Sequence, residues 1–173
     1  WFPFALGNRD RGLAQLLRAA YSSVLAKDPA QLMLAFFYFR EKKYEEATAM
    51  VKVLIKKFPE CSMAGFLLAR IHLATGKLAE AIDHLQILKQ KNPQHAGTGL
   101  LLGEAFYLTG EMEKSLQNYE EALTQNLSSF KKAEVYFGLA KANLALGQIE
   151  KAQDFLKLAR KTDSKSTWEL PQE

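Results

Sequence analysis

The sequence predicts an all-α solenoid built from antiparallel helix pairs, and two independent spacings support this fold class. An amphipathic phrase occurs four times, as "REKKYEEATAMV" (40–51), "LATGKLAEAIDHL" (73–85), "LTGEMEKSLQNY" (108–119) and "ALGQIEKAQDFL" (145–156). Within it, Gly76 and Gly110 are thirty-four residues apart, and Pro59 and Pro93 outside it are also thirty-four residues apart. Because two kinds of helix-ending residue share one period, the chain is predicted to repeat a helix-turn-helix unit.

Each glycine in the repeated phrase is predicted to end one helix and reverse the chain into the next. Glycine adopts positive φ without strain, which suits it to that turn. Lys42 occupies the glycine slot of the first copy. Gly147 follows Gly110 after 37 residues rather than thirty-four, so we expect residues 128–130 to add a turn to a longer helix with a serine N-cap.

The segment before Pro29 does not contain a complete unit. Residues 11–27, "RGLAQLLRAAYSSVLAK", are predicted to form one helix, and Asp28 and Pro29 to open the next helix as N-cap and first helical residue. Nine helices are therefore expected. The predicted parts are an N-terminal segment and capping helix (1–27), repeat 1 (28–61), repeat 2 (62–95), repeat 3 (96–129), repeat 4 (130–166) and a C-terminal tail (167–173).

Equivalent positions of these units resemble the tetratricopeptide repeat (TPR) family pattern of a large residue, Leu-Gly/Ala-x-x-Tyr, Ala-x-x-x-Phe and Pro. In repeat 2 the matching residues are Gly65, Leu68, Ala69, His72, Ala81, Leu85 and Pro93. The resemblance covers residues 28–166, with a departure from the pattern in each repeat. It implies a right-handed, TPR-type superhelical solenoid.

Small residues recur at two kinds of position in the repeats. One set is expected to let paired helices approach and comprises Ala35, Ala69, Gly103 and Ala140. The other is expected to seat large side chains of neighbouring helices and comprises Ala47, Ala81 and Ala152.

Composition and motifs argue against several functional classes. A net charge of +4, from 23 basic and 19 acidic residues, makes nucleic acid an unlikely partner, and no apolar run is long enough to cross a bilayer. The single Cys61 excludes an internal disulfide and a thiolate zinc site, which favours the cytoplasm. His72, His84 and His95 lack ligand companions at helical spacing, so no metal, cofactor or catalytic residue is predicted and no enzyme activity is expected.

The TPR resemblance instead implies a partner groove on the first helix of each repeat, at repeat positions 2, 5, 9 and 12. Carried over to this sequence, the groove residues are Leu32, Phe36, Phe39, Met63, Phe66, Arg70, Leu73, Leu100, Glu104, Tyr107, Glu134, Phe137, Lys141 and Leu144. This apolar row with charges does not match the Lys and Asn of a TPR carboxylate clamp. It favours an amphipathic helix or extended segment of another protein, and hence an adaptor or scaffold.

Alternative interpretations remain open at this point. Phe66 and Phe137 could be core residues, with Arg70, Glu104 and Lys141 as a solvated row of charges. Other hypotheses are self-association of apolar ends into a homo-oligomer through Phe155 and Leu158, a regulatory fragment of a larger protein, and a polyanion-binding ridge made by Lys56, Lys57, Lys89, Lys91, Arg160 and Lys161. Residues 32–39, "LMLAFFYF", are hydrophobic on every face and are expected to be covered by Trp1, Phe2 and Phe4 or by another chain.

Overall fold

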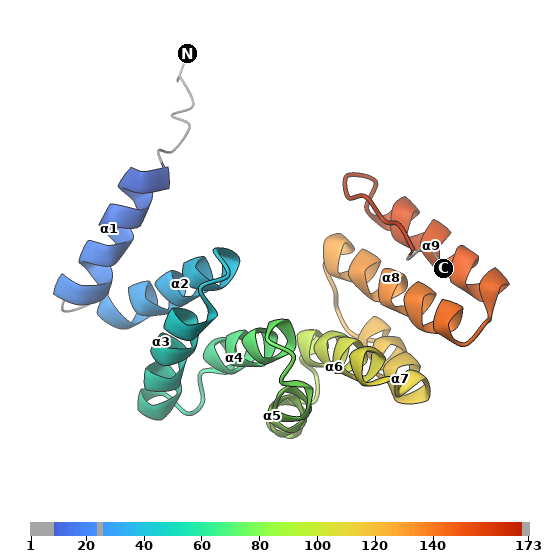
Figure 1. Ribbon diagram of the computed structural model, residues 1–173, viewed down its shortest axis with the longest axis horizontal. Helices are drawn as coiled ribbons and strands as arrows, with labels where there is room; N and C mark the ends of the chain where they lie inside the picture. Colours follow the sequence, from blue (N-terminus) through green and yellow to red (C-terminus); the bar gives the residue numbers. More distant parts are fainter. Residues whose placement is uncertain (1–8, 24–25, 171–173) are drawn as a thin grey trace, which may run out of the picture. The chain divides into compact units, whose positions relative to one another are not determined.

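The computed structural model describes residues 9–23 and 26–170, and within them it contains nine α-helices and no strand (Figure 1). The helices are α1 (Arg9–Ser22), α2 (Lys27–Arg40), α3 (Tyr44–Lys57), α4 (Ser62–Ala74), α5 (Leu78–Lys91), α6 (Ala96–Thr109), α7 (Met112–Leu123), α8 (Ser129–Ala145) and α9 (Ile149–Thr162). The predicted all-α class is confirmed. The chain packs as two compact units, one ending at Ile71 and the other beginning at His72.

The turns inside all four hairpins have the same construction. In each, the residue after the turn donates its backbone N–H to the carbonyl oxygen five positions earlier, at 2.8–2.9 Å, in the pairs Lys43–Tyr38, Lys77–His72, Glu111–Phe106 and Gln148–Asn143. The residue before each donor has positive φ, which is 72° at Gly76, 83° at Gly110 and 72° at Gly147. Lys42 takes the same conformation with φ 59°. The glycine turns are confirmed, and the lysine is held in a conformation that favours glycine.

The longer helix predicted after residue 128 is also present. α8 has 17 residues, whereas the other helices have 12 to 14. The Ser128 side chain caps it by accepting a hydrogen bond from the Lys131 backbone N–H at 3.4 Å. The three additional residues therefore lengthen a helix and leave the following turn unchanged.

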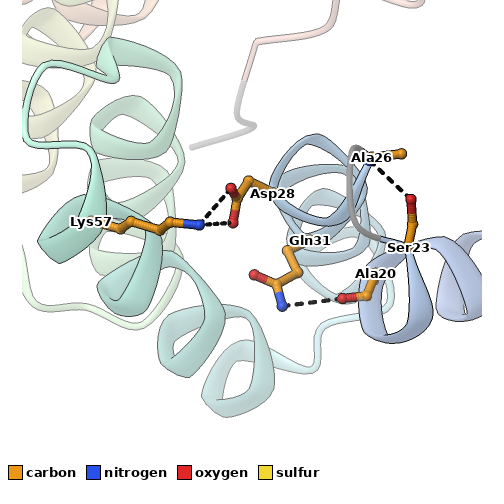
Figure 2. Close-up of polar contacts among 6 residues, drawn as sticks. All are labelled: Ala20, Ser23, Ala26, Asp28, Gln31 and Lys57. Atoms are coloured by element: carbon orange, nitrogen blue, oxygen red, sulfur yellow. Dashed lines mark hydrogen bonds and ion pairs between the residues drawn. The ribbon is translucent and has the colours of Figure 1, made fainter.

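The predicted boundary between the first two helices was wrong. α1 ends at Ser22 rather than at residue 27, and α2 already begins at Lys27, with Ala26 as its N-cap residue. The Ala26 N–H donates instead to Ser23 Oγ at 2.9 Å (Figure 2). Asp28 thus lies inside the first turn of α2, where a carboxylate is favoured by the helix dipole.

Asp28 uses its carboxylate to join α2 to α3. Lys57 Nζ donates to both carboxylate oxygens, at 2.8 and 2.6 Å, as Figure 2 shows. Gln31 Nε2 donates to the Ala20 carbonyl oxygen at 3.2 Å and ties α2 to the end of α1. The sequence predicted Asp28 as an N-cap and not as the partner of Lys57, because Lys57 is 29 residues away in the chain.

The small residues at the repeat positions are buried, as expected for residues between packed helices. Both sets are buried, with no exposed surface at any of their alanines, which are Ala35, Ala47, Ala69, Ala81, Ala140 and Ala152. Ser115 takes the alanine slot of repeat 3, and its buried hydroxyl donates to the Gly103 carbonyl oxygen at 2.7 Å. The added polar group is therefore satisfied.

The ring of Tyr119 on α7 contacts glycines on two neighbouring helices. A Cβ atom placed on Gly103 of α6 would lie 2.6 Å from Tyr119 Cδ1, and one placed on Gly138 of α8 would lie 2.3 Å from Tyr119 Cζ. Both distances are far below van der Waals contact. The ring is 3% exposed, so it has little room to move away.

The all-apolar stretch on α2 is covered only in part. Leu34 and Ala35 are fully buried, and residues 36–39 are half-buried. Met33 remains 58% exposed. The expected cover by Trp1, Phe2 and Phe4 lies outside the described residues.

We expect Lys42→Gly to stabilise the protein by about 0.5–1 kcal/mol. The substitution removes a left-handed conformation that costs a non-glycine residue roughly 1–2 kcal/mol, partly offset by the greater entropy of unfolded glycine. The matched control is Gly76→Lys, which puts lysine into the corresponding turn of the next repeat and should destabilise. Urea unfolding followed by circular dichroism measures both, and a lower midpoint for Lys42→Gly contradicts the prediction.

We expect Gly138→Ala to lower the free energy of unfolding by about 1–3 kcal/mol through overpacking against Tyr119. Gly12→Ala is the control, because a Cβ at Gly12 meets nothing within 4 Å, and it should leave stability unchanged or slightly raised. Combining Gly138→Ala with Tyr119→Leu should cost less than the sum of the single changes. If thermal and urea unfolding show strictly additive changes in stability, the cost of Gly138→Ala does not come from its contact with Tyr119.

Candidate functional site

All fourteen predicted groove residues keep part of their surface accessible. Met63 and Arg70 are exposed, and the other twelve of the fourteen positions are half-buried. Residues between them on the same helices, such as Leu67 and Leu139, are fully buried. Each first helix thus packs one side into the core and leaves its groove positions partly accessible. The phrase "groove face" below denotes these fourteen residues.

In the N-terminal unit, the groove face is built around Phe39 at the end of α2. The Arg70 guanidinium carbon lies 5.1 Å from the centre of the Phe39 ring, within cation-π range. Tyr44 approaches the same ring at 5.9 Å between centroids. Leu32 and Phe36 pack against the buried core formed by α2, α3 and α4. The groove face of this unit is therefore an aromatic and aliphatic surface with the Arg70 guanidinium stacked on it.

In the C-terminal unit, α6 and α8 bring their groove residues together. Lys141 Nζ lies 4.8 Å from the centre of the Tyr107 ring and 5.4 Å from that of Phe137. A shallow depression is lined by Leu100, Glu104, Tyr119, Glu134, Phe137, Gly138, Lys141 and Trp168. Five of the predicted groove residues therefore share one depression, and Tyr107 joins them through Lys141.

The depression combines an apolar floor with charges of both signs. Phe137 and Leu100 supply apolar surface, while Glu104 and Glu134 line it together with the Lys141 ammonium. Burial raises the pKa of the Tyr119 hydroxyl, with Glu104 among the charges that reinforce the rise, so the ring stays neutral. Such a site suits an apolar side chain flanked by polar groups, and it offers no nucleophile paired with a general base.

Trp168 contributes to the site but was not predicted from the sequence. Residues 167–173 were predicted to be a tail, and residues 163–170 contain no helix. The Trp168 ring nevertheless lies 5.2 Å from the Phe137 ring and 6.4 Å from the Phe130 ring, between centroids. A lone tryptophan in a polar segment was the only available signal.

Lys57, Lys89 and Arg160, which belong to the hypothetical basic ridge, bind partners within the fold. Lys57 binds Asp28, as described above, and Lys89 Nζ lies 2.6 Å from Glu121 Oε2 and 3.1 Å from Asn118 Oδ1. Arg160 donates to the carbonyl oxygen of Trp168. These contacts reduce the positive potential that a polyanion would meet.

Two further properties bear on the kind of site. Among the residues that the structure describes, there is no group of three or more His, Cys, Asp and Glu side chains that could hold a metal ion. None of the described helices is both long enough and apolar enough to cross a membrane.

Comparison with known families decides the classification. A tetratricopeptide repeat family model matches residues 39–96, and a second tetratricopeptide repeat model matches residues 133–165. The chain belongs to the tetratricopeptide repeat family. The TPR fold is that of a protein-protein interaction scaffold, and TPR proteins are generally not enzymes. A search of curated proteins finds no significant match to this TPR chain.

Solved TPR-like structures resemble the chain along most of its length. A thermophilic TPR protein of Thermus thermophilus has 22% identity and a TM-score of 0.72, over 79% of this chain and 75% of that protein. MamA of Desulfovibrio magneticus RS-1, from its residue 41 to its end, has 16% identity and a TM-score of 0.72, over 93% and 89%. MamA MSR-1 has 19% identity and a TM-score of 0.63, over 92% and 96%. At these identities the likeness shows a shared fold alone.

Proposed function

We propose that this TPR chain is a non-enzymatic adaptor that binds an amphipathic helix or extended apolar segment of another protein on its groove face. The observation that supports this proposal is that none of the groove positions is buried, since twelve are half-buried and Met63 and Arg70 are exposed. Aromatic and aliphatic side chains there keep apolar surface that a bound segment could remove from water. The main anchors are Phe36 and Phe39 in the N-terminal unit and Tyr107 and Phe137 in the C-terminal unit.

Energetics favour these rings as the source of affinity. Burying a large apolar side chain completely is worth about 1.5–3 kcal/mol, and aromatic and arginine residues dominate the binding energy of protein interfaces. Arg70 and Lys141 place a positive charge beside the rings. Because each already stacks on an aromatic face, binding of a partner should remove little further water from them. A segment bound to either unit should therefore combine apolar residues with an acidic residue near the cation of that unit, which is Arg70 in the N-terminal unit and Lys141 in the C-terminal unit.

The groove hypothesis makes a specific prediction for Tyr107→Ala. A peptide selected from a random displayed library on the parent chain should bind this variant about 5- to 150-fold more weakly, equivalent to about 1–3 kcal/mol, because an amphipathic anchor is lost. Arg70→Glu should also weaken the binding of peptides that carry acidic residues. Fluorescence anisotropy measures the affinities.

Two control variants separate the groove from other surfaces. Tyr21→Ala removes a tyrosine that is 61% exposed on α1 and should leave affinity unchanged. Lys56→Ala with Lys161→Ala changes two lysines of the basic ridge and should have only a small, salt-dependent effect. Peptides that ignore Tyr107 and Arg70 but are lost with these lysines would place binding on the ridge and reject the groove.

Self-association is a second candidate function, supported by one observation on α9. Leu158 is 40% exposed on this last helix. Phe155, the other residue considered, stacks on Tyr136 at 6.4 Å within the fold, so its substitution would also damage the α8–α9 contact. Leu158 is therefore the better probe of an interface between copies.

If copies pair through α9, Leu158→Glu should abolish a concentration-dependent dimer in sedimentation velocity. Ile149→Glu is the matched control, because Ile149 is 53% exposed on the same helix but nine residues away, which places it on the opposite face. A parent chain that stays monomeric at high concentration, or equal effects of the two variants, would remove this function.

A further inference from the structure

The C-terminal segment after α9 is folded by its own hydrogen bonds. Asp163 Oδ1 accepts from the Lys165 backbone N–H at 3.1 Å, and its Oδ2 accepts from the Ser166 hydroxyl. The Trp168 indole Nε1 donates to the Asp163 carbonyl oxygen at 3.1 Å. From α9, Arg160 Nε and Nη2 donate to the Trp168 carbonyl oxygen at 3.2 and 2.9 Å. The bonds from Arg160 hold the segment against α9.

Within the folded segment the Trp168 indole N–H is hydrogen-bonded, and the Trp168 ring contacts Phe137 of the groove face. An indole N–H needs a partner when it is buried, and the Asp163 carbonyl supplies one. The ring is then available for apolar contact, and it lies against Phe137 and Phe130 at interplanar angles of 46° and 41°. These two phenylalanines are seven residues apart, so they share one face of α8.

Trp168 also lines the same depression as Leu100, Glu104 and Lys141. Its indole therefore takes part of the space that the groove residues of α6 and α8 would offer to an incoming segment. Tryptophan is among the residues that most often act as binding anchors. Trp168 thus occupies the depression as an aromatic side chain of a bound partner would, but it belongs to the same chain.

We propose that residues 163–170 are an intramolecular ligand of the groove, with Trp168 in a subsite for an aromatic side chain that a partner must displace. This inference rests on the groove function proposed above and adds two statements to it. A partner segment carries an aromatic residue for the Phe137 subsite. Its apparent affinity is lowered by the resident Trp168.

The short tether makes even a weak internal contact effective. Because the segment follows α9 directly, its effective concentration at the groove is on the order of 1 mM. If the free segment would bind with a Kd of about 0.1 mM, the subsite is filled about 90% of the time, and a competitor binds about tenfold more weakly. Replacing Trp168 should therefore raise the affinity of a competitor about tenfold.

The first experiment supplies the segment as a separate molecule. A labelled peptide of residues 163–173, DSKSTWELPQE, is titrated into the full chain carrying Trp168→Ala. It should bind with a Kd of about 0.1 mM, should bind the parent chain about tenfold more weakly, and should lose binding when its own tryptophan is replaced by alanine. Adding Phe137→Ala to the chain should also abolish binding. No binding to any variant overturns the proposal.

The second experiment uses the tryptophan as a reporter. In a chain with Trp1→Phe, Trp168 is the sole tryptophan of the sequence, which has two. A saturating groove-binding peptide that contains no tryptophan should shift its emission to longer wavelength as the indole leaves the subsite. The same peptide should bind Trp168→Ala about tenfold more tightly than the parent, whereas Glu169→Ala, a change at a neighbouring position, should have no effect.

The possible outcomes separate this inference from the groove function. If groove peptides depend on Tyr107 but neither the emission of Trp168 nor Trp168→Ala affects their binding, the segment is only a structural cap and the inference fails while the groove function stands. If the peptide of residues 163–173 binds but no groove peptide can be selected, the internal contact is supported and the adaptor function fails. Emission that changes on dilution of the chain alone would assign the subsite to Trp168 of a second copy and overturn the intramolecular assignment.

Discussion

The packing of the Tyr119 ring between Gly103 and Gly138 is the constraint on which the C-terminal unit depends. A Cβ atom on either glycine would overlap the ring, at 2.6 and 2.3 Å, so α6 and α8 can both approach α7 only because these positions lack side chains. This close approach places α6 beside α8. As a result, Tyr107 and Lys141 meet, and the groove residues of two successive repeats share one depression.

Stacked cations give the groove face its chemical character. Arg70 lies over Phe39, and Lys141 lies within cation-π range of both Tyr107 and Phe137, so each cation is held against an aromatic face. The lysines on second helices differ, because Lys57 and Lys89 form ion pairs that link helices. Exposed pairs of this kind contribute little stability, about 0–1 kcal/mol, but they reduce the charge available to a polyanion.

The C-terminal segment links packing to function. Trp168 covers part of α8, and no further helix follows α9 among the residues described. The same contact blocks part of the groove face. A cap and a competing ligand are thus physically compatible roles for one side chain, because both follow from burying the indole against Phe137.

The local pattern of the sequence determined the helices, the hairpin turns and the small positions. Gly76 and Gly147 mark turns because positive φ is a property of single residues, and alanine positions such as Ala81 are buried because the repeat period is that of the hairpin. Tertiary structure decided what depends on residues distant in the chain. Asp28 pairs with Lys57 instead of capping its helix, and Trp168 contacts Phe137. Neither contact could be predicted from the sequence, because only the packed fold brings these residues within reach of each other.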